Sequence, residues 1–345
     1  MKTSDFDYHL PPELIAQTPL EPRDSCRLLV LDRRTGSVEH RSFRDLPDYL
    51  DPGDVVVMND SRVLPGRLVG RREATGGRVE LLLLRRLGPG TWMVMARPAR
   101  ALRPGVRARV PRAGHEDLEV VVLEAEPDGV RVVRLSTEEG LEVWGQVPLP
   151  PYIHARLEDP EAYQTVYARE PGSAAAPTAG LHFTRELLDG LRSRGVELAF
   201  VTLHVGLDTF APVRADDPAA HSIHGEYFEL VEREACKLRE ARASGRRIMA
   251  VGTTSVRVLE QVASGLDSGD RMDISETSGW ADVYILPGHR FRMVDAMVTN
   301  FHLPRTTLLM LVSAFAGREQ VLEAYGQAIR RGYRFYSFGD AMLLV

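Results

Sequence analysis

The sequence predicts an α/β protein, with a barrel-like α/β main domain and an all-β barrel domain inserted into it. A chain of 345 residues exceeds the usual size of a single hydrophobic core, so two domains are expected. The middle of the chain is rich in short β-type runs, whereas strand-like and helix-like segments alternate on both sides of it. We therefore assign residues 1–63 and 148–345 to a discontinuous α/β catalytic domain and 64–147 to the inserted barrel.

The inserted segment is predicted from closely spaced strands and turn signals. Turns are marked by Gly88-Pro89-Gly90, Pro104-Gly105 and Pro127-Asp128-Gly129, and strands this short and frequent suggest a small barrel or sandwich. The apolar runs between these turns are Val79–Leu84, Trp92–Met95, Leu118–Leu123 and Val130–Val133.

Four apolar strands of the α/β part end in polar residues. In parallel α/β folds the carboxyl ends of the strands form one rim, where active sites lie. Any one of these endings alone is better explained as a local cap or turn, but the four together predict one convergent polar pocket. The endings are Asn59-Asp60-Ser61-Arg62, His204-Val205-Gly206, Gly252-Thr253-Thr254-Ser255 and Asn300-Phe301-His302.

Composition is that of a soluble globular protein, with 44% hydrophobic and 26% charged residues. The first residues, Met1–Tyr8, do not form a signal peptide, and the most apolar stretch, Thr306–Ala316, is about half as long as a membrane span. Cys26 and Cys236 have no CxxC spacing and suggest neither a disulfide framework nor a zinc knuckle. We expect a cytoplasmic protein without a membrane partner.

Charge is segregated along the chain although the net charge is only −5. Between Ser61 and Arg112 thirteen arginines face only Glu73 and Glu80, so 13 minus 2 gives +11. The next stretch is acidic, with nine carboxylates between Glu116 and Glu142. A basic region of this kind suits a polyanion such as RNA, but a solvated face of the β domain explains it equally well.

Two further segments suggest ligand binding. Gly252-Thr253-Thr254-Ser255 places a glycine and hydroxyls at a helix start, where backbone N–H groups suit a carboxylate or phosphate, although an ordinary N-cap is an equal reading. Residues 171–183 hold small residues between two prolines, which allows close approach of a ligand to the backbone. A flexible linker is the alternative there, but Leu181-His182-Phe183 is too apolar for one.

A cluster of histidines and acids admits three interpretations. His221, His224 and Glu226, with His204 and Asp208 upstream, have ligand types that suit zinc or iron. The spacing His-x-x-His-x-Glu lacks the helical pairing of the metalloprotease motif, so general acid or base work is favoured over a metal site, and satisfied structural histidines remain the third interpretation.

These stretches together resemble the S-adenosylmethionine:tRNA ribosyltransferase-isomerase family over nearly the whole chain. The family's usual residues differ at Cys26 (Ser), Asp208 (Gly), Ala211 (Arg) and Ile223 (Met). The matching stretches are Asp5–Tyr8, Leu14–Gln17, Arg27–Leu29, Met58–Pro65, Pro150–Ile153, Tyr163–Tyr167, Ala176–Thr184, His204–Leu207, Ala250–Arg257, Thr299–Pro304, Tyr333–Phe335 and Gly339–Met342.

The resemblance implies an α/β barrel-like domain with an inserted β barrel. It also implies that the ribosyl part of S-adenosylmethionine is transferred to 7-aminomethyl-7-deazaguanine at the tRNA wobble position and isomerised. The products would be epoxyqueuosine-tRNA, adenine and methionine. S-adenosylmethionine is then a consumed substrate, no cofactor or metal is required, and we expect a monomer.

Such a reaction needs a base for the proton beside the sulfonium, an acid for the leaving adenine and a dry pocket. Our candidate acids and bases are His204, His224 and Glu226, followed by His182 and His302. We expect the methionine carboxylate near Gly252, Thr253 and Thr254, with Arg257 as a further candidate, and the flipped base near Asn59, Asp60 and Arg62. Thr178, Gly180 and Asn300 complete the predicted substrate-binding set.

Two competing functions follow from the same residues. A metal-dependent hydrolase would use His204, His221, His224 and Glu226. A non-catalytic RNA-binding module would show stacking aromatics beside the arginines, yet Trp92 is the one aromatic residue between Ser61 and Arg112.

Overall fold

The computed structural model describes residues 1–345 except 156, 207–212, 222, 224 and 266–273. By its internal contacts the chain divides into two compact units. The first unit, called the α/β unit below, comprises Met1–Ser61, Pro151–Glu170 and Ala176–Val345. The second, called the barrel unit, comprises Arg62–Pro150 and Pro171–Ala175.

The α/β unit is built on a nine-stranded mixed sheet that is open in the described part of the chain, with β15 and β2 at its edges. Four neighbouring strands, β12, β3, β14 and β16, run parallel to one another. The strand order is β15 (Thr277–Ala281), β13 (Glu226–Leu230), β12 (Glu197–Leu203), β3 (Val55–Asn59), β14 (Ile248–Val251), β16 (Ala296–Asn300), β17 (Ala341–Leu344), β1 (Arg27–Leu31) and β2 (Val38–Ser42).

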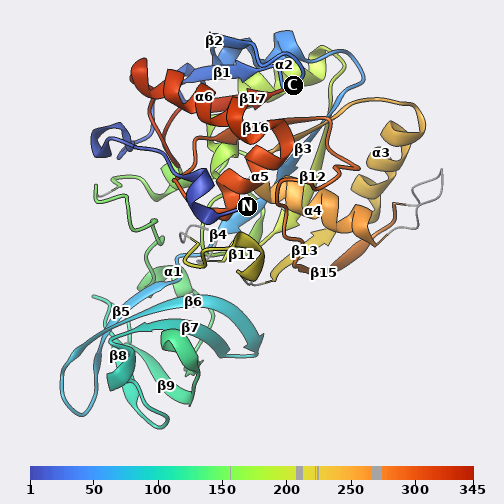
Figure 1. Ribbon diagram of the computed structural model, residues 1–345. Helices are drawn as coiled ribbons and strands as arrows, with labels where there is room; N and C mark the ends of the chain where they lie inside the picture. The colour runs from blue at the N-terminus through green and yellow to red at the C-terminus, as the bar shows by residue number, and fades with distance from the viewer. Residues whose placement is uncertain (156, 207–212, 222, 224, 266–273) are drawn as a thin grey trace. The chain divides into compact units, whose positions relative to one another are not determined.

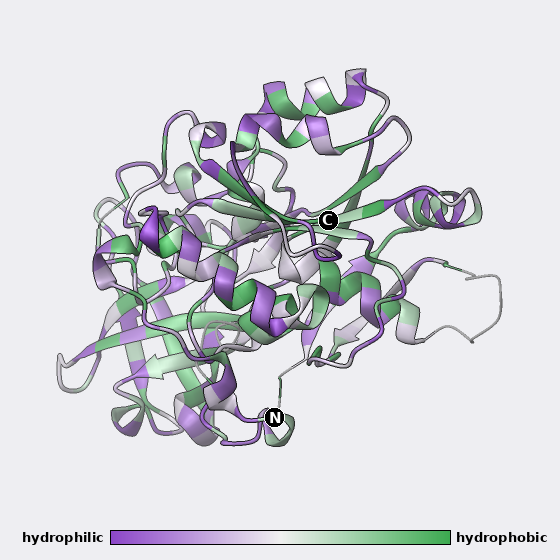
Figure 2. Cartoon of the chain, turned by 45° about the horizontal axis from the view of Figure 1, so that its top comes forward, coloured by the Kyte–Doolittle hydropathy of each residue, from purple (hydrophilic) through white to green (hydrophobic). Residues whose placement is uncertain are grey.

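The central strands are buried along their whole length. Every residue of β3, β14, β16 and β17 is buried, which explains why their sequences are continuous apolar runs rather than alternating ones. Figure 2 shows the strands around the C-terminus as predominantly hydrophobic. The four parallel strands are those whose polar endings suggested a common rim, and their adjacency in the sheet confirms that they share one.

Helices follow or flank the strands of the α/β unit. The apolar stretch Thr306–Ala316 forms the buried helix α5, whose N-cap hydroxyl on Thr306 accepts a hydrogen bond from the Leu309 N–H at 3.3 Å. No described helix has both the length and the apolar composition needed to cross a membrane. The helices are α2 (Arg185–Ser193), α3 (Glu232–Ala243), α4 (Gly252–Ser264), α5 (Thr307–Ala316) and α6 (Arg318–Arg330).

The barrel unit contains a closed six-stranded antiparallel barrel, as the sequence predicted. Alternate residues such as Val79, Leu81 and Leu83 point inward and form its core with Trp92. The strand order is β10 (Val130–Leu135), β7 (Thr91–Arg97), β6 (Arg78–Gly88), β5 (Arg67–Arg72), β8 (Arg107–Val110) and β9 (Leu118–Ala125). The short helix α1 (Leu141–Trp144) follows, and β4 (Ser61–Val63) and β11 (Glu170–Ser173) form a separate two-stranded sheet.

Folding of the barrel mixes the two charged stretches of the sequence. Glu119 and Glu138 come from the acidic stretch, and they pair with Arg109 at 3.4 Å and Arg86 at 2.7 Å. Buried Arg131 donates instead to backbone carbonyls, including that of Leu102 at 2.6 Å. The excess of +11 along the sequence is therefore partly neutralised in three dimensions.

Candidate active site

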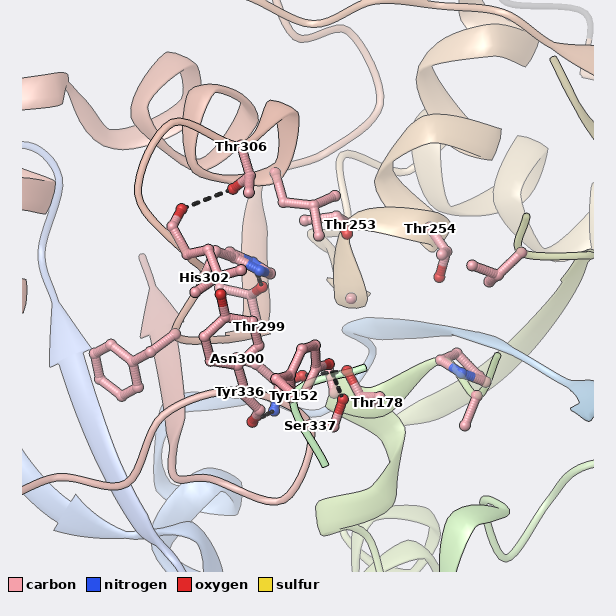
Figure 3. A pocket seen from close by; sticks show the side chains of 18 residues that line it. Tyr152, Thr178, Thr253, Thr254, Thr299, Asn300, His302, Thr306, Tyr336 and Ser337 are labelled. Carbon is pink, nitrogen blue, oxygen red and sulfur yellow. Dashed lines mark hydrogen bonds between the residues drawn. The ribbon is translucent and has the colours of Figure 1, made fainter. Parts of the chain in front are cut away.

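A cavity of the α/β unit lies at the carboxyl ends of β14 and β16 (Figure 3). Among the eighteen described residues that line it, there is no aspartate, glutamate, lysine or arginine. The lining comes from four segments that are far apart in the sequence. These are residues 176–179, 252–254, 299–303 with 306 and 308, and 336–337, together with Tyr152 and Val205.

One wall of the cavity is the first turn of α4. Gly252 adopts a φ of +83°, which L-residues rarely reach, and a Cβ there would lie 3.5 Å from the Cβ of Ala179. The Thr254 side-chain hydroxyl is buried and has no hydrogen-bond partner among the described residues. With the free N–H groups of a helix start, this wall offers donors to an anionic group.

The opposite wall carries two aromatic rings (Figure 3). The rings of Tyr152 and Tyr336 have centroids 4.3 Å apart, and the Tyr152 hydroxyl lies 2.6 Å from Ser337 Oγ. The Tyr336 hydroxyl is buried and without a partner in the described chain. We did not predict these three residues. Ser337 and Tyr336 follow no strand ending, and only their position directly after Tyr333-Arg334-Phe335 could have pointed to them.

Asn300 connects this cavity to a second, smaller one. Its side-chain oxygen accepts from the Thr178 hydroxyl at 2.8 Å, and its amide lies 3.1 Å from His182 Nε2. His182 Nδ1 lies 3.2 Å from Cys26 Sγ, and both residues line the second cavity. Burial lowers the pKa of His182 to about 3 and raises that of Cys26 above its ordinary range, so both are uncharged at neutral pH.

His302 lines the main cavity but is also firmly held. Its Nε2 lies 2.8 Å from Thr299 Oγ1, and its backbone N–H donates to the Tyr325 hydroxyl at 3.0 Å. The Tyr8 hydroxyl donates to the His302 carbonyl. Burial lowers the pKa of His302 to about 3, so the imidazole is neutral and can act as a hydrogen-bonding group more readily than as a strong base.

His204 follows β12 directly, next to Val205 of the cavity wall. Its Nδ1 is buried and has no partner among the described residues. Burial lowers its pKa, while the nearby carboxylate of Asp60 opposes that shift. His224, another of the five candidate acids and bases, lies outside the described residues, as do Asp208 and Ala211.

Glu226 and Arg257 form a buried ion pair that lines neither cavity. The second carboxylate oxygen of Glu226 accepts from the Gly206 N–H at 2.7 Å, and Arg257 also donates to the Ala281 carbonyl at 2.7 Å. The pair joins α4 to β13, β15 and the segment after β12. The structure thus places two predicted site residues in a paired cluster, called the Glu226–Arg257 cluster below.

Asn59 and Asp60 are also occupied by neighbouring groups. Asn59 bridges β3 and β12, donating to the Leu203 carbonyl and accepting from the Leu203 N–H, both at 3.0 Å. Asp60 accepts from Thr202 at 2.8 Å and pairs with Arg169 at 2.6 Å. Arg62, by contrast, belongs to the barrel unit.

The predicted site residues therefore do not form a single site: some line the main cavity, and others lie elsewhere in the structure. Gly180 packs under Tyr167, since a Cβ at that glycine would lie 2.0 Å from the tyrosine hydroxyl. In the described parts of the chain no three histidine, cysteine, aspartate or glutamate residues are grouped to hold a metal ion. The predicted residues that line the main cavity are Thr178, Gly252, Thr253, Thr254, Asn300 and His302.

Comparison with known proteins gives one consistent result. Residues 3–344 match the family described as queuosine biosynthesis protein. A protein of Symbiobacterium thermophilum named S-adenosylmethionine:tRNA ribosyltransferase-isomerase is 53% identical over 349 aligned positions, covering 100% of both chains. One of the same name from Moorella thermoacetica is 52% identical over 350 positions, again covering 100% of both.

A solved structure agrees with these relatives. The crystal structure of S-adenosylmethionine tRNA ribosyltransferase from Thermotoga maritima is 41% identical, with a TM-score of 0.57. The match covers 99% of this chain and 100% of that one. By full-length similarity, the chain belongs to the queuosine biosynthesis protein family.

Proposed function

We propose that this chain transfers the ribosyl part of S-adenosylmethionine to 7-aminomethyl-7-deazaguanine at the wobble position of tRNA and isomerises it. The products are epoxyqueuosine-tRNA, adenine and methionine. The observation that carries this proposal is the full-length similarity to enzymes named for ribosyl transfer and isomerisation. The cavity described above is the site we assign to S-adenosylmethionine.

The cavity suits this substrate because its two walls differ in chemistry. The start of α4 presents N–H groups and the hydroxyls of Thr253 and Thr254, which suit the methionine carboxylate. The rings of Tyr152 and Tyr336 offer an apolar surface to the adenine. Because none of the described lining residues is a carboxylate, none of them offers the sulfonium a fixed counter-ion that would stabilise the ground state.

Proton removal next to the sulfonium needs a neutral base with a free lone pair. His204 fits this role best, because its pKa is lowered by burial and its Nδ1 has no partner in the described chain. Glu226 fits less well, since Arg257 and the Gly206 N–H already occupy its two carboxylate oxygens. We therefore assign proton removal to His204 and a structural role to Glu226.

The tRNA partner is assigned to the barrel unit. Arg71 and Arg78 lie opposite each other on β5 and β6, whereas Arg109, which faces Arg71 from β8, already pairs with Glu73 and Glu119. Like charges facing each other across strands destabilise a sheet, and a phosphate backbone would relieve that repulsion.

Two unpaired cysteines suit a cytoplasmic protein, and we further propose that it acts as a monomer without a cofactor.

The test is one reaction without added metal, containing the purified chain, S-adenosylmethionine and a tRNA that carries 7-aminomethyl-7-deazaguanine. Nucleoside mass spectrometry reports epoxyqueuosine, and the supernatant is assayed for adenine. We expect both in equal amounts, unchanged by a chelator. If folded protein binds the tRNA but yields neither product, the proposal fails and a non-catalytic RNA-binding role replaces it. Loss of activity with chelator would instead favour the metal-dependent hydrolase.

A further inference from the structure

Tyr336 combines two energetically unfavourable features, one in its backbone and one in its side chain. Its φ of +74° lies in the left-handed region, where a bulky aromatic residue is a genuine outlier. Its hydroxyl is buried, yet no described residue hydrogen-bonds to it. Strained backbone and unpartnered buried polar groups are both costly, and both concentrate at functional sites.

The backbone around Tyr336 is held in this conformation from three sides. Its N–H donates to the Phe301 carbonyl at 3.2 Å, and its own carbonyl accepts from the Gly339 N–H at 2.8 Å. The same carbonyl accepts from the Asn300 side-chain amide at 3.2 Å. Asn300 ends β16, so the sheet that forms the cavity rim also fixes the strained residue.

The result of this strain is the position of the side chain. Tyr336 lines the cavity with its ring against Tyr152, on the wall that faces the start of α4 (Figure 3). A phenol hydroxyl can donate one hydrogen bond and accept others, so an unpartnered one in a cavity is satisfied by a ligand atom or by water. An aromatic wall selects planar, heteroaromatic ligand groups.

We propose that the Tyr336 hydroxyl binds the adenine of S-adenosylmethionine and donates a hydrogen bond to one of its ring nitrogens. This inference rests on the proposed function, because it assigns one part of that substrate to one wall of the same cavity. As the bond between the sugar and adenine breaks, its electron pair moves onto the purine ring. A fixed donor at a ring nitrogen then binds the departing base more strongly than the intact substrate.

Tyr336 keeps its own proton in this scheme. Burial, with Tyr152 and Tyr325 nearby, raises the pKa of its hydroxyl above the ordinary range, so it is a hydrogen-bond donor at every working pH. The proton that adenine finally carries comes from another acid or from water.

The test is Tyr336→Phe, which removes the hydroxyl and keeps the ring. We expect a melting temperature equal to or above that of the wild type, because an unpartnered buried hydroxyl is lost. We expect kcat/KM for S-adenosylmethionine to fall by about ten- to a hundredfold. The matched control is Tyr325→Phe, whose hydroxyl accepts from the His302 N–H and whose loss should lower the melting temperature.

Inhibition by each product separately tests whether the Tyr336 hydroxyl contacts the adenine part of the substrate. Adenine alone should inhibit Tyr336→Phe about tenfold less than the wild type, whereas inhibition by methionine should be unchanged. Turnover within about threefold of the wild type overturns the inference, and so does a loss of methionine inhibition in place of adenine inhibition. If Tyr336→Phe is unstable, the hydroxyl has a structural role and the inference is also overturned. If the wild type itself releases no adenine, the proposed function fails, which is a separate outcome.

Discussion

The cavity and the Glu226–Arg257 cluster both include residues of helix α4, but they differ in how their buried polar side chains are satisfied. In the cavity the hydroxyls of Thr254 and Tyr336 have no partners among the described residues. In the cluster, both carboxylate oxygens of Glu226 meet donors within the protein, one from the Arg257 guanidinium and one from a backbone N–H, while Arg257 Nε has no partner among the described residues. Buried groups that the fold satisfies hold elements together, whereas buried groups that it leaves open are available to a ligand.

The substitution with the largest expected effect on this contrast is Arg257→Met. It leaves the buried carboxylate of Glu226 without its cation, so we expect a loss of about 3–5 kcal/mol in the free energy of unfolding, measured with denaturant. The control is Arg192→Met, which removes an exposed ion pair with Asp189 and should cost less than ~1 kcal/mol. If Arg257→Met keeps its stability but binds S-adenosylmethionine weakly, Arg257 belongs to the substrate site, as the sequence suggested.

Acid should weaken the fold through the buried histidines. Burial lowers the pKa of His182 and of His302 from 6.5 to about 3. The unfolded chain therefore binds more protons between these values, so stability is complete above pH 6.5 and falls as the pH drops toward 3. Each histidine should contribute a loss of roughly 2 kcal/mol at pH 5 relative to pH 7.5.

Urea unfolding at several pH values measures this loss. In His182→Asn, the free energy of unfolding should fall less steeply as the pH drops, by about the amount that one histidine contributes. An unchanged dependence in that variant would show that His182 is protonated in the folded protein, contrary to its buried position.

A smaller effect on stability is expected from removing the Thr254 hydroxyl, which has no hydrogen-bond partner among the described residues. Thr254→Val keeps the shape and removes an unpartnered group, so stability should change by less than ~0.5 kcal/mol while KM for S-adenosylmethionine rises roughly threefold to tenfold. Thr306→Val is the matched control in the same cavity, because the Thr306 hydroxyl caps α5 and its loss should cost about 1 kcal/mol. Equal destabilisation by the two substitutions would contradict the distinction between open and satisfied groups.

The smallest effects should come from the barrel unit. Arg71→Gln and Arg78→Gln each remove one of two facing positive charges, so stability should stay level or rise slightly. If these arginines meet tRNA phosphates, each change should reduce the slope of log affinity against log salt by about one, measured by filter binding. Arg86→Gln, which loses an ion pair with Glu138, is the control that should leave the slope unchanged.

Local patterns in the sequence predicted most of the framework. The runs before Asn59, Gly252 and Asn300 are buried strands, and together with β12, which precedes His204, they bring all four predicted endings to neighbouring strands of the sheet. Apolar periodicity, turn residues and helix starts act over a few residues, so they can be recognised without a structure. The inserted barrel and the helix start at Gly252 were predictable for the same reason.

The partners of individual polar atoms were decided only by the tertiary structure. Nothing near Arg257 in the sequence indicates that Glu226 neutralises it, and nothing in the basic stretch indicates that Glu119 and Glu138 return to its arginines. Tyr336 packs against Tyr152 on one wall of the cavity although 184 positions separate them in the chain. Whether a polar group is satisfied depends on such long-range contacts, so the sequence determined the strands and their polar ends, and the folded structure determined which of those ends remain open to a substrate.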